Sequence, residues 1–128
     1  VLPMLPNMEM TAIKTASAIA EFMHFDSDRI DEVKIALVEA LINAFEHSQS
    51  GDQKVYIKFL MDHDELTVII QDHGKGFQTE EIAKPDIQHK LHADYKRGWG
   101  LMLIENLMDS VQISSNTQGT TLVMSKHR

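Results

Sequence analysis

The segment "ALVEALINAFEH", Ala36–His47, decides how this chain folds. Its apolar residues recur every three or four positions, the spacing of a helix that buries one face against a core. Glu39 and Asn43 interrupt this pattern, and because they are four residues apart, a helix places them on the same face. The segment therefore predicts a helix that presents two polar groups together to whatever that face meets.

Composition limits the classes of protein that remain. A chain of 128 residues, 43% hydrophobic and 24% charged, suits one compact domain. The net charge of −7 and the pI of about 5.4 provide no basic surface for a phosphate backbone, so we expect no direct nucleic-acid partner. The absence of cysteine excludes disulfides and thiol chemistry and fits a cytoplasmic location. No apolar run approaches the roughly 18 residues of a membrane span, so we expect no membrane insertion.

The residues on either side of the opening segment predict alternating helices and strands. The predicted elements are, in chain order, an edge strand or extended lead-in at 2–7, helices at about 10–25 and 30–47, strands at 55–61 and 66–70, a helix at about 100–108, and strands at 111–115 and 120–125. The long stretch at residues 72–98, between the strand at 66–70 and the helix at about 100–108, is predicted to be loop.

Three further segments carry polar or glycine-rich patterns at the ends of these elements: "DHGKG" from Asp72, "KRGWGLMLIENLMDS" from Lys96, and "GTTL" from Gly119. Glycines after an apolar strand let the chain turn, or let a flat ligand approach without meeting a Cβ atom. Glycines just before a helix leave backbone N–H groups free to bind an anion. Each pattern alone also fits an ordinary turn or helix start.

Together and in this order, the segments resemble the motifs of the GHKL ATP-binding fold found in gyrase, histidine kinases and MutL. The closest resemblance is to the small anti-sigma-factor serine kinases of the RsbW and SpoIIAB type. "EALINAFEH" resembles the N box, "DHGKG" the first glycine box, "RGWGLMLIENLMDSV" the second and "GTTL" the last. The resemblance implies an α+β fold, a two-layer sandwich with a mostly antiparallel sheet covered by helices on one face, in a single domain over residues 1–128.

The resemblance also implies roles for the polar residues, with ATP and Mg²⁺ as cofactors. Asn43 would bind Mg²⁺ through its side-chain oxygen, and Glu39 would act as the general base that takes the proton of the attacking hydroxyl. Asp72 would accept a hydrogen bond from the amine of adenine, with Gly74 and Gly76 giving the base room.

The remaining implied nucleotide contacts lie later in the chain. Thr120 or Thr121 would support the adenine contact, and residues 78–97 would form a lid over the ATP. The other expected contacts are Gly98 and Gly100 as hinge and amide donors, Leu101 beside them, and Lys96 or Arg97 at the γ-phosphate. His89 and His92 are three residues apart, but a metal site there lacks an evident third ligand, so we interpret them as solvated lid residues.

Three interpretations of the function remain open at this point. The first is a protein serine/threonine kinase of a partner-switching system, which phosphorylates a STAS-domain anti-anti-sigma protein and otherwise binds a sigma factor or another target, with a homodimer expected. The second is a nucleotide-gated binding module without kinase activity. The third is an ATP-binding domain excised from a larger fused regulator or a histidine kinase, which the first residue, Val1, is compatible with.

Overall fold

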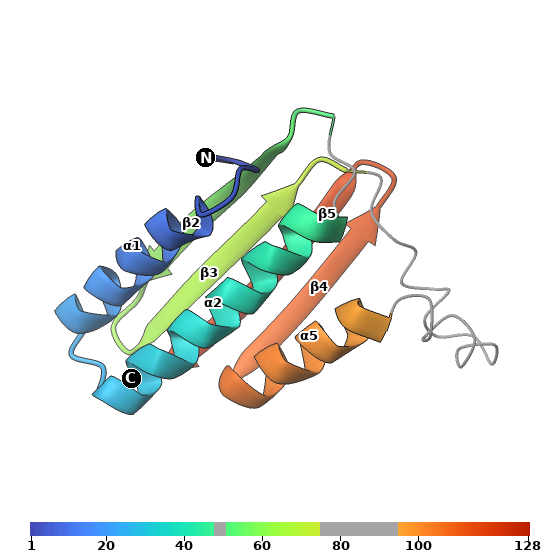
Figure 1. Ribbon diagram of the computed structural model, residues 1–128. Helices are drawn as coiled ribbons and strands as arrows, with labels where there is room; N and C mark the ends of the chain where they lie inside the picture. Colours follow the sequence, from blue (N-terminus) through green and yellow to red (C-terminus); the bar gives the residue numbers. More distant parts are fainter. Residues whose placement is uncertain (48–50, 75–94) are drawn as a thin grey trace, which may run out of the picture.

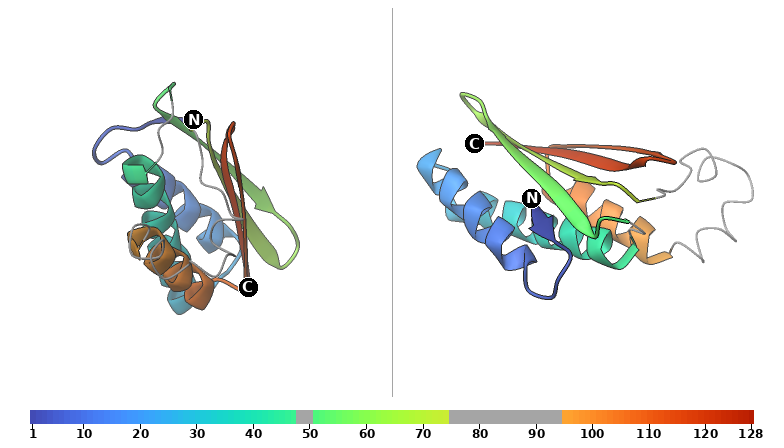
Figure 2. Two further views of the ribbon diagram at one scale, coloured as in Figure 1. Left: turned by 90° about the vertical axis from the view of Figure 1, so that its right-hand side faces the viewer. Right: turned by 90° about the horizontal axis from the view of Figure 1, so that it is seen from above.

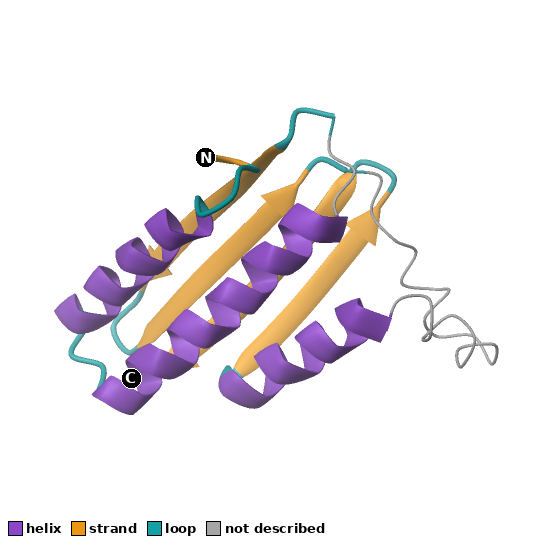
Figure 3. Ribbon diagram, in the orientation of Figure 1, coloured by secondary structure: helices purple, strands orange, loops and turns teal. Residues whose placement is uncertain are grey.

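The computed structural model of the protein describes residues 1–47, 51–74 and 95–128, and of residues 47 and 95–100 the backbone alone. The elements in this part of the chain are β1 (Leu2–Pro3), α1 (Glu9–Phe22), α2 (Ser27–His47), β2 (Lys54–Met61), β3 (Glu65–Asp72), α5 (Tyr95–Leu107), β4 (Ser110–Asn116) and β5 (Gly119–His127). Figure 3 distinguishes these helices from the strands over which they lie. The order of elements predicted from the sequence is confirmed, with changes at the helix ends.

The strands form one antiparallel sheet in the order β1-β2-β3-β5-β4. In Figure 1, α2 crosses the middle of this sheet, with α1 beside β2 and α5 beside β4. The perpendicular views of Figure 2 place α1, α2 and α5 on the same side of the sheet. The predicted α+β sandwich, with an antiparallel sheet covered on one face, is therefore confirmed.

Asp26 fixes the start of α2. Its Oδ1 accepts a hydrogen bond of 2.8 Å from the backbone N–H of Arg29, and its carbonyl oxygen accepts one from the N–H of Ile30. This is the geometry of an N-cap, which satisfies N–H groups that have no partner within the helix. The cap starts the helix at Ser27, three residues before the predicted Ile30. The N–H of Arg29 also lowers the pKa of the Asp26 carboxyl.

The core lies between the sheet and the three helices. α1 meets it through a stripe of small side chains four residues apart, Ala12, Ala16 and Ala20, which let this helix pack closely. The largest fully buried side chains come from α2, α5 and the sheet: Val33, Leu37, Leu41, Val55, Leu66, Val68, Ile104 and Met124. Burying each such side chain contributes about 1.5–3 kcal/mol, so this core fixes how α2 and α5 sit over the sheet.

Lys126 of β5 contacts both α2 and the C-terminal end of α5, and so links these helices to the sheet. Its Nζ donates to Glu32 Oε2 on α2 at 2.7 Å and to the carbonyl oxygen of Leu107 at the end of α5 at 2.5 Å. The side chain is only 8% exposed. An ammonium group at the last carbonyls of α5 satisfies acceptors that the helix leaves open and complements the negative end of its dipole.

Within the described ranges, no helix has both the length and the apolar composition needed to cross a membrane.

Candidate functional site

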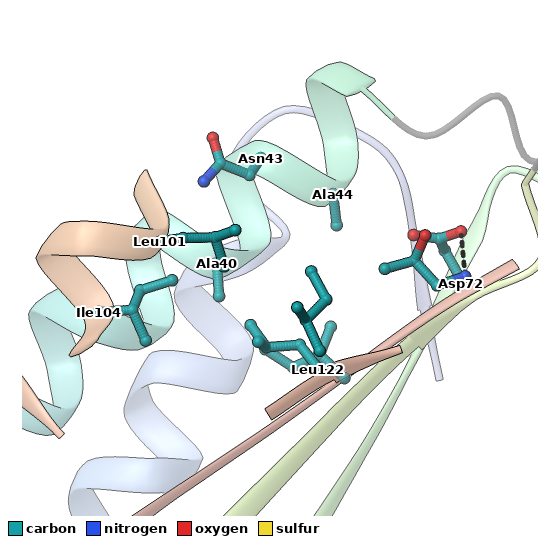
Figure 4. Close-up of a pocket in the computed structure, with 10 residues that line it drawn as sticks. Ala40, Asn43, Ala44, Asp72, Leu101, Ile104 and Leu122 are labelled. Atoms are coloured by element: carbon teal, nitrogen blue, oxygen red, sulfur yellow. Dashed lines mark hydrogen bonds between the residues drawn. The ribbon is translucent and has the colours of Figure 1, made fainter. Parts of the chain in front are cut away.

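A pocket of about 400 Å³, its open mouth included, lies between α2, α5 and the sheet. It is lined by Ala40, Asn43 and Ala44 of α2, by Leu101 and Ile104 of α5, and by Ile70, Asp72, Ile113, Thr120 and Leu122 of the sheet. Figure 4 shows Asn43 on the helix side of this pocket and Asp72 on the sheet side, with Leu122 on the floor between them. Apolar walls with a few polar groups are typical of small-molecule sites.

Asp72 is the buried carboxylate of the pocket, with 4% of its surface exposed. Its Oδ1 accepts hydrogen bonds from the backbone N–H of Gly74 at 3.0 Å and of Thr120 at 3.4 Å. The second of these is drawn in Figure 4. In the part of the chain that the structure describes, Oδ2 has no donor. Because a buried oxygen without a donor is costly, an N–H group of a ligand is the natural partner for Oδ2.

The strand register places Thr120 and Thr121 on opposite faces of the sheet. Thr120 lies opposite Asp72 in the β3–β5 pair, is buried, and lines the pocket. Thr121 points to the other face of the sheet, beside Gln112 and Ser114, because neighbouring residues of a strand alternate in direction. Thr120 is therefore the threonine at the site, and Thr121 is not.

Asn43 and Glu39 lie on successive turns of α2, and both are half-buried. Asn43 lines the pocket, as predicted, near the C-terminal end of the helix. Glu39 follows the same face one turn earlier but is not among the lining residues. Neither side chain hydrogen-bonds to another residue of the described ranges.

The glycine-rich segments are described only in part. Gly74 is buried and donates to Asp72, and Leu101 lines the pocket, as predicted. Gly76, His89, His92 and most of the predicted lid, residues 78–94, lie outside the described residues.

The N-terminal part of α5 differs from the prediction. The helix begins at Tyr95 instead of near Gly100, so the backbones of Lys96, Arg97, Gly98 and Gly100 belong to its first turns and not to a hinge before it. A glycine costs a helix about 1 kcal/mol relative to alanine, and the two glycines suggested a break for that reason. Packing of Leu101 and Ile104 holds the helix in place and offsets this cost. The side chains of Lys96 and Arg97 are not described.

Gly119 was marked in the sequence only as the first residue of "GTTL", with no role of its own. It has a φ of +146°, and a Cβ atom built on it would lie 2.0 Å from the carbonyl oxygen of Asp72. Only glycine allows this approach, which brings the turn between β4 and β5 against the backbone of Asp72. Its place at the head of "GTTL" was the available signal.

Three features define the class of protein. They are a buried carboxylate at the end of a central strand, a glycine turn behind it, and a helix that presents an asparagine and a glutamate. This arrangement is that of a GHKL-type ATP-binding domain.

Comparison with known proteins shows the family. The family of histidine kinase-like ATPase domains matches residues 2–126, and the chain belongs to it. Its curated relatives include proteins named serine-protein kinase RsbW. The one from Bacillus subtilis is 34% identical over 119 residues, covering 88% of this chain and 74% of the relative. The one from Listeria monocytogenes is 31% identical over 132 aligned positions, covering 98% of this chain and 83% of the relative. The resemblance inferred from the motifs is thus confirmed.

Solved structures show the same fold. The crystal structure of the RsbU and RsbW domains of a Mycobacterium tuberculosis protein matches with a TM-score of 0.73 at 19% identity, covering 98% of this chain and 30% of that one. The histidine kinase domain of a blue-light-activated kinase from Erythrobacter litoralis matches with a TM-score of 0.54 at 15% identity, covering 88% of this chain and 61% of that one.

Proposed function

We propose that the protein is an ATP-dependent serine-protein kinase and anti-sigma-type regulator, which phosphorylates a STAS-domain anti-anti-sigma protein. The observation that carries this proposal is that Asn43 on α2 and the buried carboxylate of Asp72 lie on opposite sides of the pocket, with Glu39 one turn before Asn43 on the same helix. The relatives named serine-protein kinase RsbW support the reaction class.

The pocket suits the adenine of ATP. Its walls between Ala40, Ala44 and Leu122 are apolar, as a flat aromatic base requires. Oδ2 of Asp72 is available to accept a hydrogen bond from the exocyclic amine of adenine. Guanine carries a carbonyl oxygen at that position, and a carboxylate would repel it, so the same contact selects adenine.

Asn43 suits a Mg²⁺ ion that arrives with the triphosphate. Mg²⁺ prefers oxygen ligands and is usually held by one or two protein groups together with substrate phosphates and water. The described residues contain no cluster of three or more histidine or acidic side chains that could hold a metal by itself. A single amide oxygen at the pocket lining fits this shared mode of binding, and when bound the ion offsets negative charge on the phosphates.

In this proposal Glu39 acts as the general base. It follows the face of α2 that carries Asn43, one turn from the residue that would hold the metal. In this role its carboxylate accepts the proton of the substrate serine hydroxyl as that oxygen forms a bond to the γ-phosphorus and the bond from this phosphorus to the bridging oxygen breaks, which releases ADP. A half-buried carboxylate with no ion pair among the described residues is free to take up that proton.

The partners and compartment belong to the same proposal. We expect a STAS-domain protein as the phosphate acceptor, a sigma factor or another regulatory protein as the alternative partner, a homodimer, and a cytoplasmic location. Sedimentation of the purified protein tests the dimer.

The decisive experiment is a labelled-phosphate transfer assay with ATP and Mg²⁺, in which STAS-domain proteins from the same genome serve as acceptors. The wild type is compared with Glu39→Gln, and with Glu21→Gln, which changes an exposed glutamate of α1 as a matched control. We expect phosphoserine with the wild type and the control, and a loss of at least about 100-fold in Glu39→Gln, within the range of general base catalysis. ATP affinity should stay unchanged in all three proteins.

The other outcomes separate the alternatives. Tight ATP binding with no transfer to any acceptor would overturn the kinase and leave a nucleotide-gated binding module. Equal transfer by Glu39→Gln and wild type would remove Glu39 as the base.

A further inference from the structure

Asp52, Tyr56 and His73 form a cluster where the chain leaves β3. Oδ2 of Asp52 accepts a hydrogen bond from the hydroxyl of Tyr56 at 2.9 Å and lies 3.2 Å from Nδ1 of His73. The rings of Tyr56 and His73 contact each other, with centroids 4.5 Å apart and a tilt of 31°. The hydrogen bond to Asp52 raises the pKa of the Tyr56 hydroxyl. These three groups therefore constrain one another.

The cluster joins two parts of the chain that carry the site. Asp52 lies in the turn that follows α2, the helix of Asn43, and its Oδ1 also accepts a hydrogen bond from the N–H of Lys54 at the start of β2. His73 lies between Asp72 and Gly74 in the sequence, and its exposed side chain points away from the buried one of Asp72. Asp52 therefore holds the residue that directly follows the adenine-binding carboxylate.

The opposite side of the same backbone is held by Gly119. An added Cβ atom there would lie 2.0 Å from the carbonyl oxygen of Asp72 and 3.1 Å from Cα of His73. The backbone of Asp72 and His73 is thus packed against the β4–β5 turn on one side and fixed through the His73 ring on the other. Two constraints on successive residues leave the direction of the Asp72 carboxylate little freedom.

We propose that Asp52, Tyr56 and His73 are positioning residues, which aim Oδ2 of Asp72 at the exocyclic amine of adenine and so set the preference for adenine over other bases. The inference rests on the proposed function, because it assumes that Asp72 contacts adenine. None of the three residues lines the pocket. They act through the backbone of His73 and not by touching the nucleotide.

The test compares the affinities for ATP and for inosine triphosphate, whose base has a carbonyl oxygen in place of the amine. The ratio of the two dissociation constants reports the contact with Asp72, whereas a general loss of structure weakens both nucleotides equally. The variants are Asp52→Asn and Tyr56→Phe, which removes one hydroxyl and keeps the ring. Asp64→Asn is the matched control, because Asp64 also contacts a histidine, His63 at 2.8 Å, but in the turn at the far end of β2 and β3.

We expect the wild type and Asp64→Asn to share the same preference for ATP, and the preference to fall about three- to tenfold in Asp52→Asn and Tyr56→Phe. That range corresponds to the net contribution of one hydrogen bond. Melting curves show whether each variant is folded, and if Asp52→Asn is not, Tyr56→Phe decides the test. An unchanged ratio in a folded variant overturns the positioning role. A wild type without any preference for ATP overturns the proposed adenine contact instead, and this inference with it.

Discussion

Replacement of Gly119 by alanine tests the geometry behind the site most directly. The added methyl group would lie 2.0 Å from the carbonyl oxygen of Asp72, so one of the two backbones must move by more than an ångström to reach an ordinary contact. The residue also has a φ of +146°, which alanine adopts only with strain of about 1–3 kcal/mol. Overpacking costs about as much again, typically 1–3 kcal/mol. We therefore expect Gly119→Ala to lose on the order of 2–6 kcal/mol of stability.

Gly51→Ala is the matched control for this change. An added Cβ atom at Gly51 meets nothing within 4 Å, and its φ is not in the left-handed region. Reduced freedom of the unfolded chain then makes this substitution neutral or stabilising by up to about 1 kcal/mol. Urea denaturation followed by circular dichroism measures both variants, and the slope of the transition shows whether unfolding stays two-state.

The same substitution should weaken ATP binding, because the shift falls on the backbone that carries Asp72. Isothermal calorimetry on the folded variant at low temperature measures this effect. A Gly119→Ala protein within about 0.5 kcal/mol of the wild type in stability would refute the close approach, since that is the range of surface changes that touch nothing.

Three further outcomes follow from other contacts. Lys126→Met keeps the buried stem but leaves Glu32 and the end of α5 without a donor, so we expect a loss of about 1–3 kcal/mol in urea denaturation. Tyr56 has a pKa above its ordinary 10.0 because of Asp52, so this contact adds stability that is present below pH 10 and is lost as the pH rises through the raised pKa. Absorbance titration should show its ionisation at lower pH in Asp52→Asn. Asn43→Ala should weaken ATP binding in the presence of Mg²⁺ far more than with EDTA, and equal weakening in both would remove Asn43 as a metal ligand.

The fold was largely predictable because its central elements follow simple periodicities. The apolar spacing around Leu37 and Leu41 can form only an amphipathic helix, and the alternation from Val55 to Ile70 fits a hairpin with one buried face. The helix ends were less predictable. At the start of α2, residues next to Asp26 have side chains that can also cap a helix, so the sequence does not mark one first residue. The start of α5 depends on tertiary packing that outweighs the low helix propensity of its glycines.

The positions of Asp72 and Asn43 in the pocket were predictable because each lies in a motif that resembles one of the GHKL family. The choice between Thr120 and Thr121 depends on the strand register, since a shift by one residue reverses the face, and local sequence does not fix that register. Gly119 and the cluster around Asp52 act through contacts between segments far apart in the chain. Their importance becomes visible only when those segments are brought together.

The pocket is assembled from residues of α2, β3, α5, β4 and β5, and its central hydrogen bond joins residues 48 positions apart. Residues of α2, α5 and the sheet must all be in place to form the pocket, so ligand binding and folding are thermodynamically linked. A ligand at 100 times its dissociation constant adds about 2.7 kcal/mol to a domain whose total stability is on the order of 5–15 kcal/mol. Degradation that proceeds through the unfolded chain then slows by about 100-fold when nucleotide is abundant. Under the proposed function, the cellular supply of ATP would therefore also set how long each molecule survives.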